Sequence, residues 1–414
     1  MIISKVFFSP LLCGFRKGHS THHALLKILL NWQKSLDNKG VVGAVLMDLS
    51  KAFDTLPHDL LIAKLACYGL SKPSLNLIHS FLSHRHQRVK IGDKFSNWKQ
   101  IGLGVPQGSI LGPLLFNIFL NDLFLFILES DICNFADDNT LSSCDLSYYV
   151  VKYTLKADAI RALEWFKTNS LVANPEKFQM LILGYNDVEN DFFEFANIKI
   201  VCSKTVRLLG IDIDNKLNFN SHIDKICKIV NNKTNALVRI RNFVDEEKAH
   251  KIAQAYILSQ FNYCSLIWMF CSKTANHKIE RAHKRVLRVI IQDFSVPFNE
   301  LLSHFGSKSI HQRNLYSLMS EVYKSQNYLN PIFIREFFTP KVIPYSLRSG
   351  SLLKLPQVQG RSYGIYCLQF RAIWSWNNLP KFVKSSESFV IFKTRLRGIQ
   401  KDGQIYCNCR LCRD

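Results

Sequence analysis

Two adjacent carboxylates, Asp137 and Asp138, lie between two short and mostly apolar runs, and no other feature constrains the fold as much. The flanking runs predict two strands joined by a tight turn. A third carboxylate, Asp48, follows residues 41–47, a continuous apolar run typical of a central buried strand. An isolated pair of aspartates is most often a turn former. Three carboxylates on one sheet edge would not be explained by turn formation alone. Two such charges about 4 Å apart repel by about 4 kcal/mol at an effective dielectric of 20.

A bound cation would relieve this repulsion and explain the pattern. Carboxylate oxygens are hard ligands, so the set favours Mg²⁺ or Mn²⁺, ions that keep coordination positions open for substrate phosphates. The residues therefore predict phosphoryl transfer assisted by two metal ions.

The charge of the chain points to an acidic polymer as partner. The 414 residues carry a net charge of +21 and are 47% hydrophobic, which excludes a disordered chain and allows two or three domains. Residues 1–150 hold 14 Lys/Arg against 11 Asp/Glu, and residues 151–220 hold 9 against 9. Residues 221–414 hold 30 against 12, so a nearly neutral first half precedes a basic second half. Nucleic acid is the predicted partner of that second half.

The 12 cysteines follow no repeating spacing, which favours free thiols in a reducing, intracellular compartment. Cys407, Cys409 and Cys412 form the one cluster, and three thiols without a fourth ligand downstream make a poor zinc site. The longest apolar run, 110–128, has the length of a membrane span, but polar residues lie in its middle. We expect a buried amphipathic helix there and no membrane partner.

The remaining pattern alternates helices and hairpins. Capping residues, prolines and periodicity predict helices from about Ser20 to Trp32, Pro57 to Gly69, Pro73 to His84, Ile110 to Leu128 and Ser147 to Thr168. Hairpins are predicted from Gln87–Ile91 with Phe95–Ile101 and from Ile198–Cys202 with Val206–Ile213, and a strand is predicted over Phe178–Leu183. From Asn220 onward the pattern is helical, including the basic run Lys278–Arg288.

The order of the motifs resembles the palm of reverse transcriptases. The resemblance rests on Asp48 with Phe53, Gly104–Ser109 leading to Gly112 and Pro113, and Phe135–Asp138. Details resemble the non-LTR, LINE-like retrotransposon branch: Gly14–Arg16 with Gly18–Thr21, Asp48–Asp54, Asn174–Lys177, and Leu208–Gly210 followed by Ile213 and Asp214. The match covers roughly residues 10–225, and a weaker similarity to the C-terminal tails of such elements covers Phe370–Pro380.

This resemblance implies an α+β right-hand polymerase fold. Its palm is an antiparallel sheet backed by helices, followed by a mostly helical, basic thumb and C-terminal region. The implied domains are a palm with partial fingers over 1–219, a thumb over 220–300 and a basic helical region over 301–414. The implied activity is RNA-directed DNA polymerisation, with an RNA template, a DNA primer and deoxynucleotides as partners.

The resemblance also implies the catalytic roles. Asp48, Asp137 and Asp138 would hold two Mg²⁺ or Mn²⁺ ions, and Lys177 would give a proton to the leaving pyrophosphate.

The substrate contacts follow from the same resemblance. Phe53 would be the steric gate against a ribose 2′-OH. Gln107 and Gly108 would line the incoming nucleotide and the template, and Arg16 would contact the triphosphate. The turn at Leu209 and Gly210 resembles a primer grip.

Two features depart from the family pattern and leave other interpretations open. Because the chain begins close to Gly14–Arg16, we expect it to lack the fingers strands that usually precede this motif, and an endonuclease domain. We expect part of a longer polyprotein or a truncated genomic copy. The alternatives are an inactive remnant that only binds nucleic acid, and a polymerase like those of group II intron maturases or telomerase.

Overall fold

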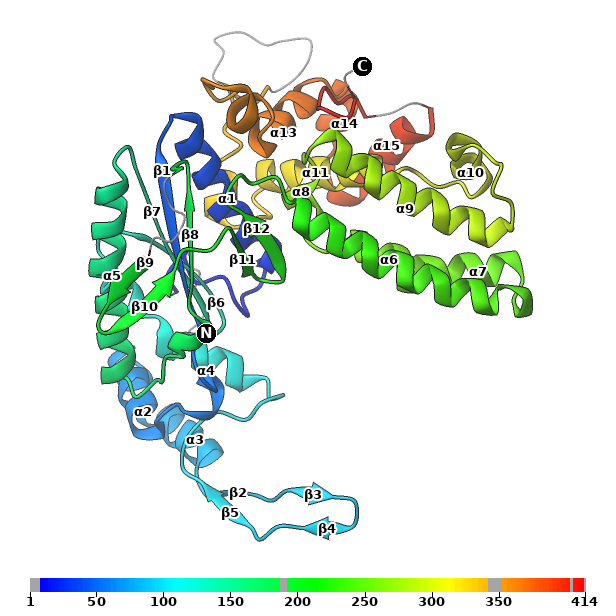
Figure 1. The fold of residues 1–414 in the computed structure, drawn as a ribbon. Coiled ribbons are helices and arrows are strands. Elements are labelled where there is room, and N and C mark those ends of the chain that lie inside the picture. Colours follow the sequence, from blue (N-terminus) through cyan, green and yellow to red (C-terminus); the bar gives the residue numbers. More distant parts are fainter. Residues whose placement is uncertain (1–7, 187–191, 342–351, 403–404, 413–414) are drawn as a thin grey trace. The chain divides into compact units, whose positions relative to one another are not determined.

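The computed structural model describes residues 8–186, 192–341, 352–402 and 405–412 of the chain. By their contacts the residues form two compact units (Figure 1). The first unit contains residues 1–24 and 40–203, and the second unit contains residues 25–39 and 204–414. The three carboxylates predicted to bind metal therefore all belong to the first unit.

A four-stranded antiparallel sheet forms the centre of the first unit, in the strand order β6, β7, β1, β8. Every residue of β1 (Val41–Met47) is buried, as its continuous apolar run predicted. β1 pairs on one side with β7 (Asp138–Asp145) and on the other with β8 (Gln179–Leu183). β6 (Asp131–Phe135) completes the sheet beyond β7, which confirms the predicted hairpin around the paired aspartates.

One long helix, α5 (Tyr148–Thr168), packs along this sheet (Figure 1). Val151 and Leu155, two apolar residues one turn apart on this helix, are fully buried. Gly43 allows the close approach, because a Cβ at this position would lie 2.6 Å from the side chains of both residues. The helix thus fixes the central strand, and with it the position of Asp48 at the strand's end.

The helix predicted over 110–128 is shorter than expected. α4 (Leu111–Leu120) ends at Asn121, and a single 3-10 turn (Leu123–Leu125) follows. Lys64 explains this end, because its Nζ donates to the Phe119 carbonyl and lies 2.7 Å from Asp122 Oδ1. A cation at a helix C-terminus satisfies the last carbonyl groups and favours termination there.

The other elements of the first unit agree with the sequence pattern. Prolines precede or open two helices as predicted, and an exposed double hairpin closes at Gly92 and Asp93. The bounds are α2 His58–Cys67, α3 Lys72–Leu82, β2 Arg85–Gln87, β3 Lys90–Ile91, β4 Lys94–Phe95 and β5 Lys99–Ile101.

The hairpin predicted from 198–202 with 206–213 is wrong. β10 (Ile198–Val201) pairs with the preceding β9 (Phe192–Phe195), and β11 (Thr205–Leu208) pairs with the following β12 (Ile211–Asp214). Leu209 and Gly210 form the β11–β12 turn with φ of 45° and 79°. Two positive φ values match the twist of a two-residue hairpin loop, so this turn divides the predicted strand.

The second unit is mostly helical. Side chains cap several of its helices: Asp245 accepts from Lys248 N, Ser272 from Ala275 N, Ser309 from Gln312 N and Cys367 from Phe370 N. Its main helices are α6 Asn220–Ile240, α7 Glu246–Ile252, α8 Ser265–Trp268, α9 Lys273–Ile291, α10 Phe298–His304, α11 Ile310–Gln326, α12 Ile332–Arg335, α13 Leu368–Asn377, α14 Lys381–Lys384 and α15 Phe389–Asp402; most of α1 (Thr21–Asp37) also groups with this unit.

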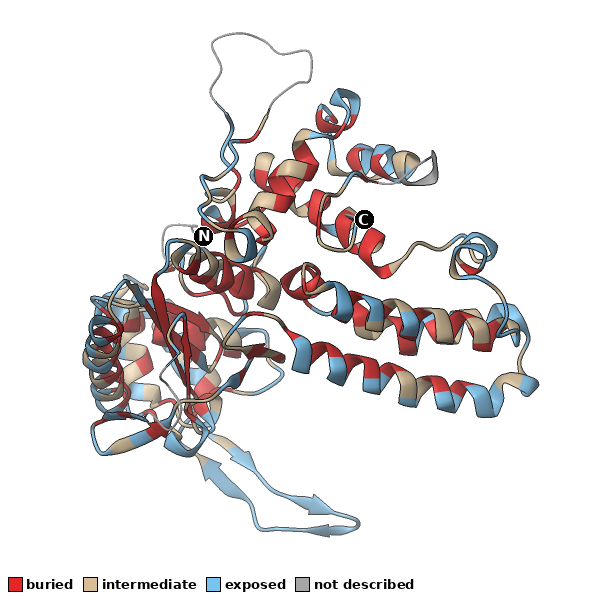
Figure 2. Cartoon of the chain, turned by 45° about the horizontal axis from the view of Figure 1, so that its top comes forward, coloured by how far each residue is buried: buried red, intermediate tan, exposed pale blue. Residues whose placement is uncertain are grey.

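Helices α6 and α9 pack side by side, each burying one face and exposing the other (Figure 2). Ile279 and Val286, two turns apart on α9, are buried on the apolar face of this amphipathic helix. Arg285 donates to Asn231 Oδ1 at 3.2 Å across the helix pair. At least this arginine of the basic run therefore makes a hydrogen bond within the unit.

The observed architecture confirms the predicted α+β class, with an antiparallel sheet backed by helices and a mostly helical second part. Among the residues that the structure describes, no helix has both the length and the apolar character needed to span a membrane.

Candidate active site

The strand register brings the predicted carboxylates to one edge of the sheet. Met47 of β1 is paired with Asn139 of β7, so one further step along the antiparallel strands sets Asp48 opposite Asp138. Phe135 pairs with Asp138, which leaves Ala136 and Asp137 as a two-residue loop at the same edge. Residues directly opposite each other in such a pair have Cβ atoms about 4.5–5.5 Å apart.

The charges of these side chains interact. Burial raises the pKa of Asp138 to about 6, with further contributions from the negative charges of Asp137 and Asp48, while Lys177 opposes the rise. Part of the Asp138 residue is exposed, but the protein around its carboxyl group removes enough water to disfavour the charged form; Asp137 is half-buried. The negative charges of Asp137 and Asp48 thus add to the effect of burial on Asp138, in the direction expected for converging carboxylates.

One buried carboxylate oxygen of Asp48 has an ion pair with Lys177 but no hydrogen bond. This oxygen, Oδ2, is buried and accepts no hydrogen bond from any residue in the described ranges. Lys177 Nζ lies 3.2 Å away without hydrogen-bond alignment, and that lysine side chain is 65% exposed. A buried, unbonded anionic oxygen beside two further carboxylates is a donor set suited to a hard cation.

Backbone pairing explains why Lys177 lies near Asp48. Ser50 N donates to Val172 O at 2.7 Å, and Asn174 N donates to Asp48 O at 2.9 Å. A 3-10 turn (Pro175–Lys177) then leads into β8. This turn brings its lysine to the carboxylates.

Two buried asparagines fix the loop that carries Asp137, and sequence reasoning missed both. Asn134 and Asn139 are paired across the hairpin, and Asn134 Nδ2 donates to Asn139 Oδ1 at 3.0 Å. Asn134 Nδ2 also donates to Ala136 O at 2.7 Å, and Asn139 Nδ2 donates to Asp137 O at 3.0 Å. Amides within otherwise apolar strands were the available signal, because buried polar groups need partners.

An N-terminal loop supports the same turn from the edge of the sheet. Cys13 N donates to Asn134 O at 2.9 Å, and Asn117 Nδ2 donates to Gly14 O at 2.8 Å. A Cβ on Gly14 would lie 2.5 Å from Ala136 N, closer than real Cβ contacts. The glycine therefore permits the loop to pack directly against the Asp137 turn.

Arg16 follows this loop, and its guanidinium group donates hydrogen bonds to backbone carbonyls of the loop. Nη1 donates to Ser9 O at 2.6 Å and to Leu12 O at 3.0 Å. Burial lowers the pKa of Arg16. Its predicted contact with a triphosphate stays a prediction.

Phe53 is positioned by stacking. It lies in a 3-10 turn (Ala52–Asp54), and its ring stacks on Phe116 of α4 with a centroid distance of 4.2 Å. Phe15 meets the same ring edge-on at 5.9 Å. Rings fixed on two sides suit the predicted steric role, because a wall must keep its position to exclude a hydroxyl.

The glycine-rich loop 104–109 is hydrogen-bonded to the backbone of the segment that carries Phe53. Gly104 N donates to Leu56 O at 2.7 Å, and Val105 N donates to Phe53 O at 2.8 Å. Gln107 and Gly108 are exposed, and Gln107 Nε2 donates to Asp54 Oδ1 at 2.9 Å. The loop is thus bonded to the backbone of Phe53 and, through Gln107, to the neighbouring Asp54; the shared role of Phe53 and Gln107 at the nucleotide stays a prediction.

Comparison with known proteins agrees with this geometry. The family described as "Reverse transcriptase (RNA-dependent DNA polymerase)" matches residues 1–213, just over half of the chain. The chain belongs to the reverse transcriptase family. All of the predicted catalytic and substrate-binding residues lie inside this match.

Several curated relatives of this reverse transcriptase are named after transposons or mobile elements. It is 25% identical over 300 residues to the "Probable RNA-directed DNA polymerase from transposon BS" of Drosophila melanogaster, covering 67% of this chain and 32% of that one. It is 28% identical over 221 residues to the "RNA-directed DNA polymerase from mobile element jockey" of the same species, covering 51% and 24%. These matches confirm the LINE-like branch, and the chain spans about a third or less of the length of these relatives.

A solved structure of telomerase from Candida tropicalis in complex with a TWJ fragment of telomeric RNA is also similar. The identity is 14%, the match covers 74% of this chain and 51% of that chain, and the TM-score is 0.38. At this score the likeness adds nothing to the argument from the residues.

Within the second unit of the reverse transcriptase, the turn predicted as a primer grip is held by an aromatic side chain. Tyr263 Oη donates to Leu209 O at 2.7 Å, and its ring lies 3.3 Å from the position of a Cβ on Gly210. The role of this turn stays a prediction.

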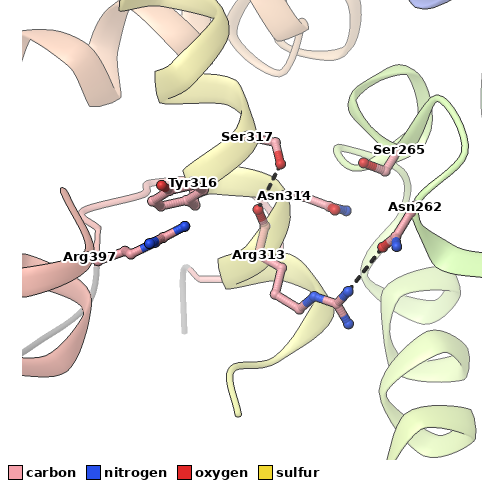
Figure 3. Close-up of a pocket in the computed structure, with 7 residues that line it drawn as sticks. All are labelled: Asn262, Ser265, Arg313, Asn314, Tyr316, Ser317 and Arg397. Carbon is pink, nitrogen blue, oxygen red and sulfur yellow. Dashed lines mark hydrogen bonds between the residues drawn. The ribbon is translucent and has the colours of Figure 1, made fainter. Parts of the chain in front are cut away.

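A pocket in the same unit presents two arginines, Arg313 from α11 and Arg397 from α15 (Figure 3). Arg313 Nη2 donates to Asn262 Oδ1 at 3.0 Å, and the Arg397 guanidinium lies 6.0 Å from the Tyr316 ring. Guanidinium groups match the geometry of phosphate oxygens, so the pocket is a candidate phosphate contact.

Proposed function

We propose that this reverse transcriptase domain adds deoxynucleotides to a DNA primer on an RNA template by nucleotidyl transfer assisted by two divalent ions. The observation that carries the proposal is the convergence of Asp48, Asp137 and Asp138 on one sheet edge. The buried and unbonded Oδ2 of Asp48 and the raised pKa of Asp138 support it.

The donor set fits Mg²⁺ or Mn²⁺ better than a softer metal, because every converging ligand atom is a carboxylate oxygen. When bound, such ions lower the pKa of the attacking hydroxyl and neutralise charge on the transferred phosphate. Asp48, Asp137 and Asp138 would hold the ions in place.

The other residues would position the nucleotide. Lys177, with its exposed ammonium, would give a proton to the leaving pyrophosphate. The Phe53 ring, held by its stack on Phe116, would occupy the space that a ribose 2′-OH needs. Gln107 and Gly108 would line the nucleotide and template.

The basic second part of the chain would hold the primer-template by its phosphates. Residues 221–414 carry 30 Lys/Arg against 12 Asp/Glu. Phosphate contacts supply affinity and orientation without reading sequence, which suits an enzyme that must accept any template.

Primer extension on an RNA template, with the purified chain and Mg²⁺ or Mn²⁺, tests the proposal. We expect the wild type to extend the primer and Asp137→Asn to abolish extension, with duplex affinity nearly unchanged. Asp131→Asn is the matched control, because Asp131 is an exposed aspartate at the other end of the same hairpin.

The same experiment separates the alternatives. Binding of primer-template without any extension by the wild type would overturn the proposal in favour of an inactive, nucleic-acid-binding remnant.

A further inference from the structure

Four potential metal ligands from distant parts of the sequence meet within the second unit. The Sγ atoms of Cys407, Cys409 and Cys412 and an imidazole nitrogen of His311 all lie within 4.8 Å of one another. Cys409 Sγ is 3.5 Å from His311 Nε2, and Cys412 Sγ is 3.4 Å from the same nitrogen. His311 and Cys409 are 98 residues apart in the sequence. The fourth donor that the cysteine cluster lacks downstream is therefore supplied from upstream.

These separations match a tetrahedral zinc site. Zn–S distances of about 2.3 Å and Zn–N distances of about 2.0–2.1 Å place a sulfur and a nitrogen ligand about 3.5–3.6 Å apart at the tetrahedral angle. Two sulfur ligands are then about 3.8 Å apart. The two measured S···N distances agree with the first value, and the 4.8 Å limit accommodates the second.

Hydrogen bonds would hold the cluster only weakly. A neutral imidazole nitrogen has one lone pair, so Cys409 and Cys412 would have to share Nε2 as acceptor. Thiols are also weak donors, and a third thiol, Cys407, lies in the same group. A single cation that accepts one lone pair from each of the four ligands would satisfy all of them at once.

The local structure places each ligand firmly enough for a site. His311 is buried in the first turn of α11, whose N-terminus is capped by Ser309. Cys409 is buried, and nearby Ile405 is 1% exposed. Cys407 is half-buried and Cys412 is exposed, which leaves a path for an ion to enter.

We propose that His311, Cys407, Cys409 and Cys412 bind one structural Zn²⁺. Three thiolates and one imidazole complete a four-coordinate shell and leave no position open for a substrate, so the site is structural and not catalytic. It lies in the second unit, and it stands independently of the proposed polymerase activity.

The proposed role of the ion is to attach the segment 405–412 to α11. The segment also contacts the unit through a stack of Tyr406 on Trp374 at 5.6 Å, the Arg410 guanidinium 4.6 Å from the Tyr366 ring and the buried Ile405. Aromatic contacts of this kind are each worth about 1 kcal/mol, and the ion would add a link from three cysteines of the segment to α11.

Metal analysis of the full chain, purified without chelator from zinc-supplemented cells, tests the site. We expect about one Zn²⁺ per chain in the wild type and in Cys67→Ser, whose exposed thiol lies at the end of α2. Cys409→Ser and His311→Ala should lower the zinc content at least severalfold. Zinc below a tenth of an equivalent in the wild type, or equal zinc in Cys409→Ser and Cys67→Ser, would overturn the proposal.

A second measurement remains decisive if those variants fold poorly. Co²⁺ added to the metal-free wild type should give the intense visible bands of tetrahedral coordination and near-ultraviolet thiolate charge transfer. His311→Cys retains four donors and should keep the metal. A weak octahedral Co²⁺ spectrum would contradict a thiolate-rich tetrahedral site.

Limited proteolysis tests the attachment of the segment 405–412 by the metal. The protease should release this segment faster after chelation, and an unchanged rate would refute the attachment.

Discussion

Replacing Asp138 by Asn should stabilise the metal-free protein at neutral pH, even though it damages the proposed site. The change removes one of three converging negative charges and keeps the side-chain shape. The β1–β7 register sets Asp138 opposite Asp48, so their charges are about 5 Å apart. At this distance the repulsion is about 0.8 kcal/mol in a water-like dielectric and about 3 kcal/mol at an effective dielectric of 20. Because Asp138 is exposed and Lys177 offsets part of the repulsion, we expect a gain of about 1 kcal/mol.

The raised pKa of Asp138 determines how the stability gain from Asp138→Asn changes with pH. The pKa of Asp138 is raised from 3.8 to about 6, so the folded protein holds this proton more tightly than the unfolded chain does. The contribution of the group to stability is therefore complete below the unfolded pKa of 3.8 and is lost as the pH rises through about 6. The Asp138→Asn gain should be largest at neutral pH and should disappear in mild acid, where the wild type is protonated.

Thermal unfolding in the presence of a chelator measures the effect. A gain of about 1 kcal/mol corresponds to a rise in Tm of about 2–4 °C for a unit of this size. Asp131→Asn, at the far end of the hairpin, should leave Tm unchanged. Saturating Mn²⁺ should reverse the order, because only the wild type keeps all three ligands. An Asp138→Asn protein that is no more stable at neutral pH than in acid would refute the argument from converging charges.

Three further predictions concern the loop, the gate and the basic region. Gly14→Ala should reduce primer extension at least tenfold without unfolding the protein, because the new Cβ displaces the Ala136 backbone and with it the Asp137 turn; unchanged extension would exclude this support. Phe53→Ala should admit ribonucleotides in single-turnover incorporation, and an unaltered preference for deoxynucleotides would remove Phe53 from the gate. Binding of primer-template should weaken with salt with a log–log slope of about −4 or steeper if residues 221–414 contact six or more phosphates, whereas a flat salt dependence would contradict that role.

The sequence predicted the centre of the site because its signals are local. A continuous apolar run before Asp48 and two short runs around Asp137 and Asp138 specify three neighbouring strands, and the structure pairs them as expected. The apolar face of α5 was equally readable, because helical periodicity persists over its whole length.

The supporting contacts could not be predicted because they depend on pairing between distant segments. The Asn134–Asn139 amide pair requires the strand register, and the packing of Gly14 on Ala136 requires the loop's position at the sheet edge. His311 joins the cysteine cluster only through the packing of α11.

The wrong prediction of a hairpin between residues 198–202 and 206–213 also arose because strand pairing is not specified locally. Strands 198–201 and 205–208 are close in sequence, but each pairs with another neighbour, and the turn at Leu209 and Gly210 decides the second pairing. Short alternating strands carry little information about their partners.

Counting bound Mn²⁺ by electron paramagnetic resonance tests the central claim most directly. The chain would be measured with primer-template, a primer that lacks its 3′-OH and the matching deoxynucleotide, so that no turnover occurs. The proposed site predicts two ions per chain in the wild type and in Asp131→Asn, and loss of at least one in Asp137→Asn. Equal Mn²⁺ binding by the wild type and Asp137→Asn, or no binding by either, would contradict a two-ion site at Asp48, Asp137 and Asp138.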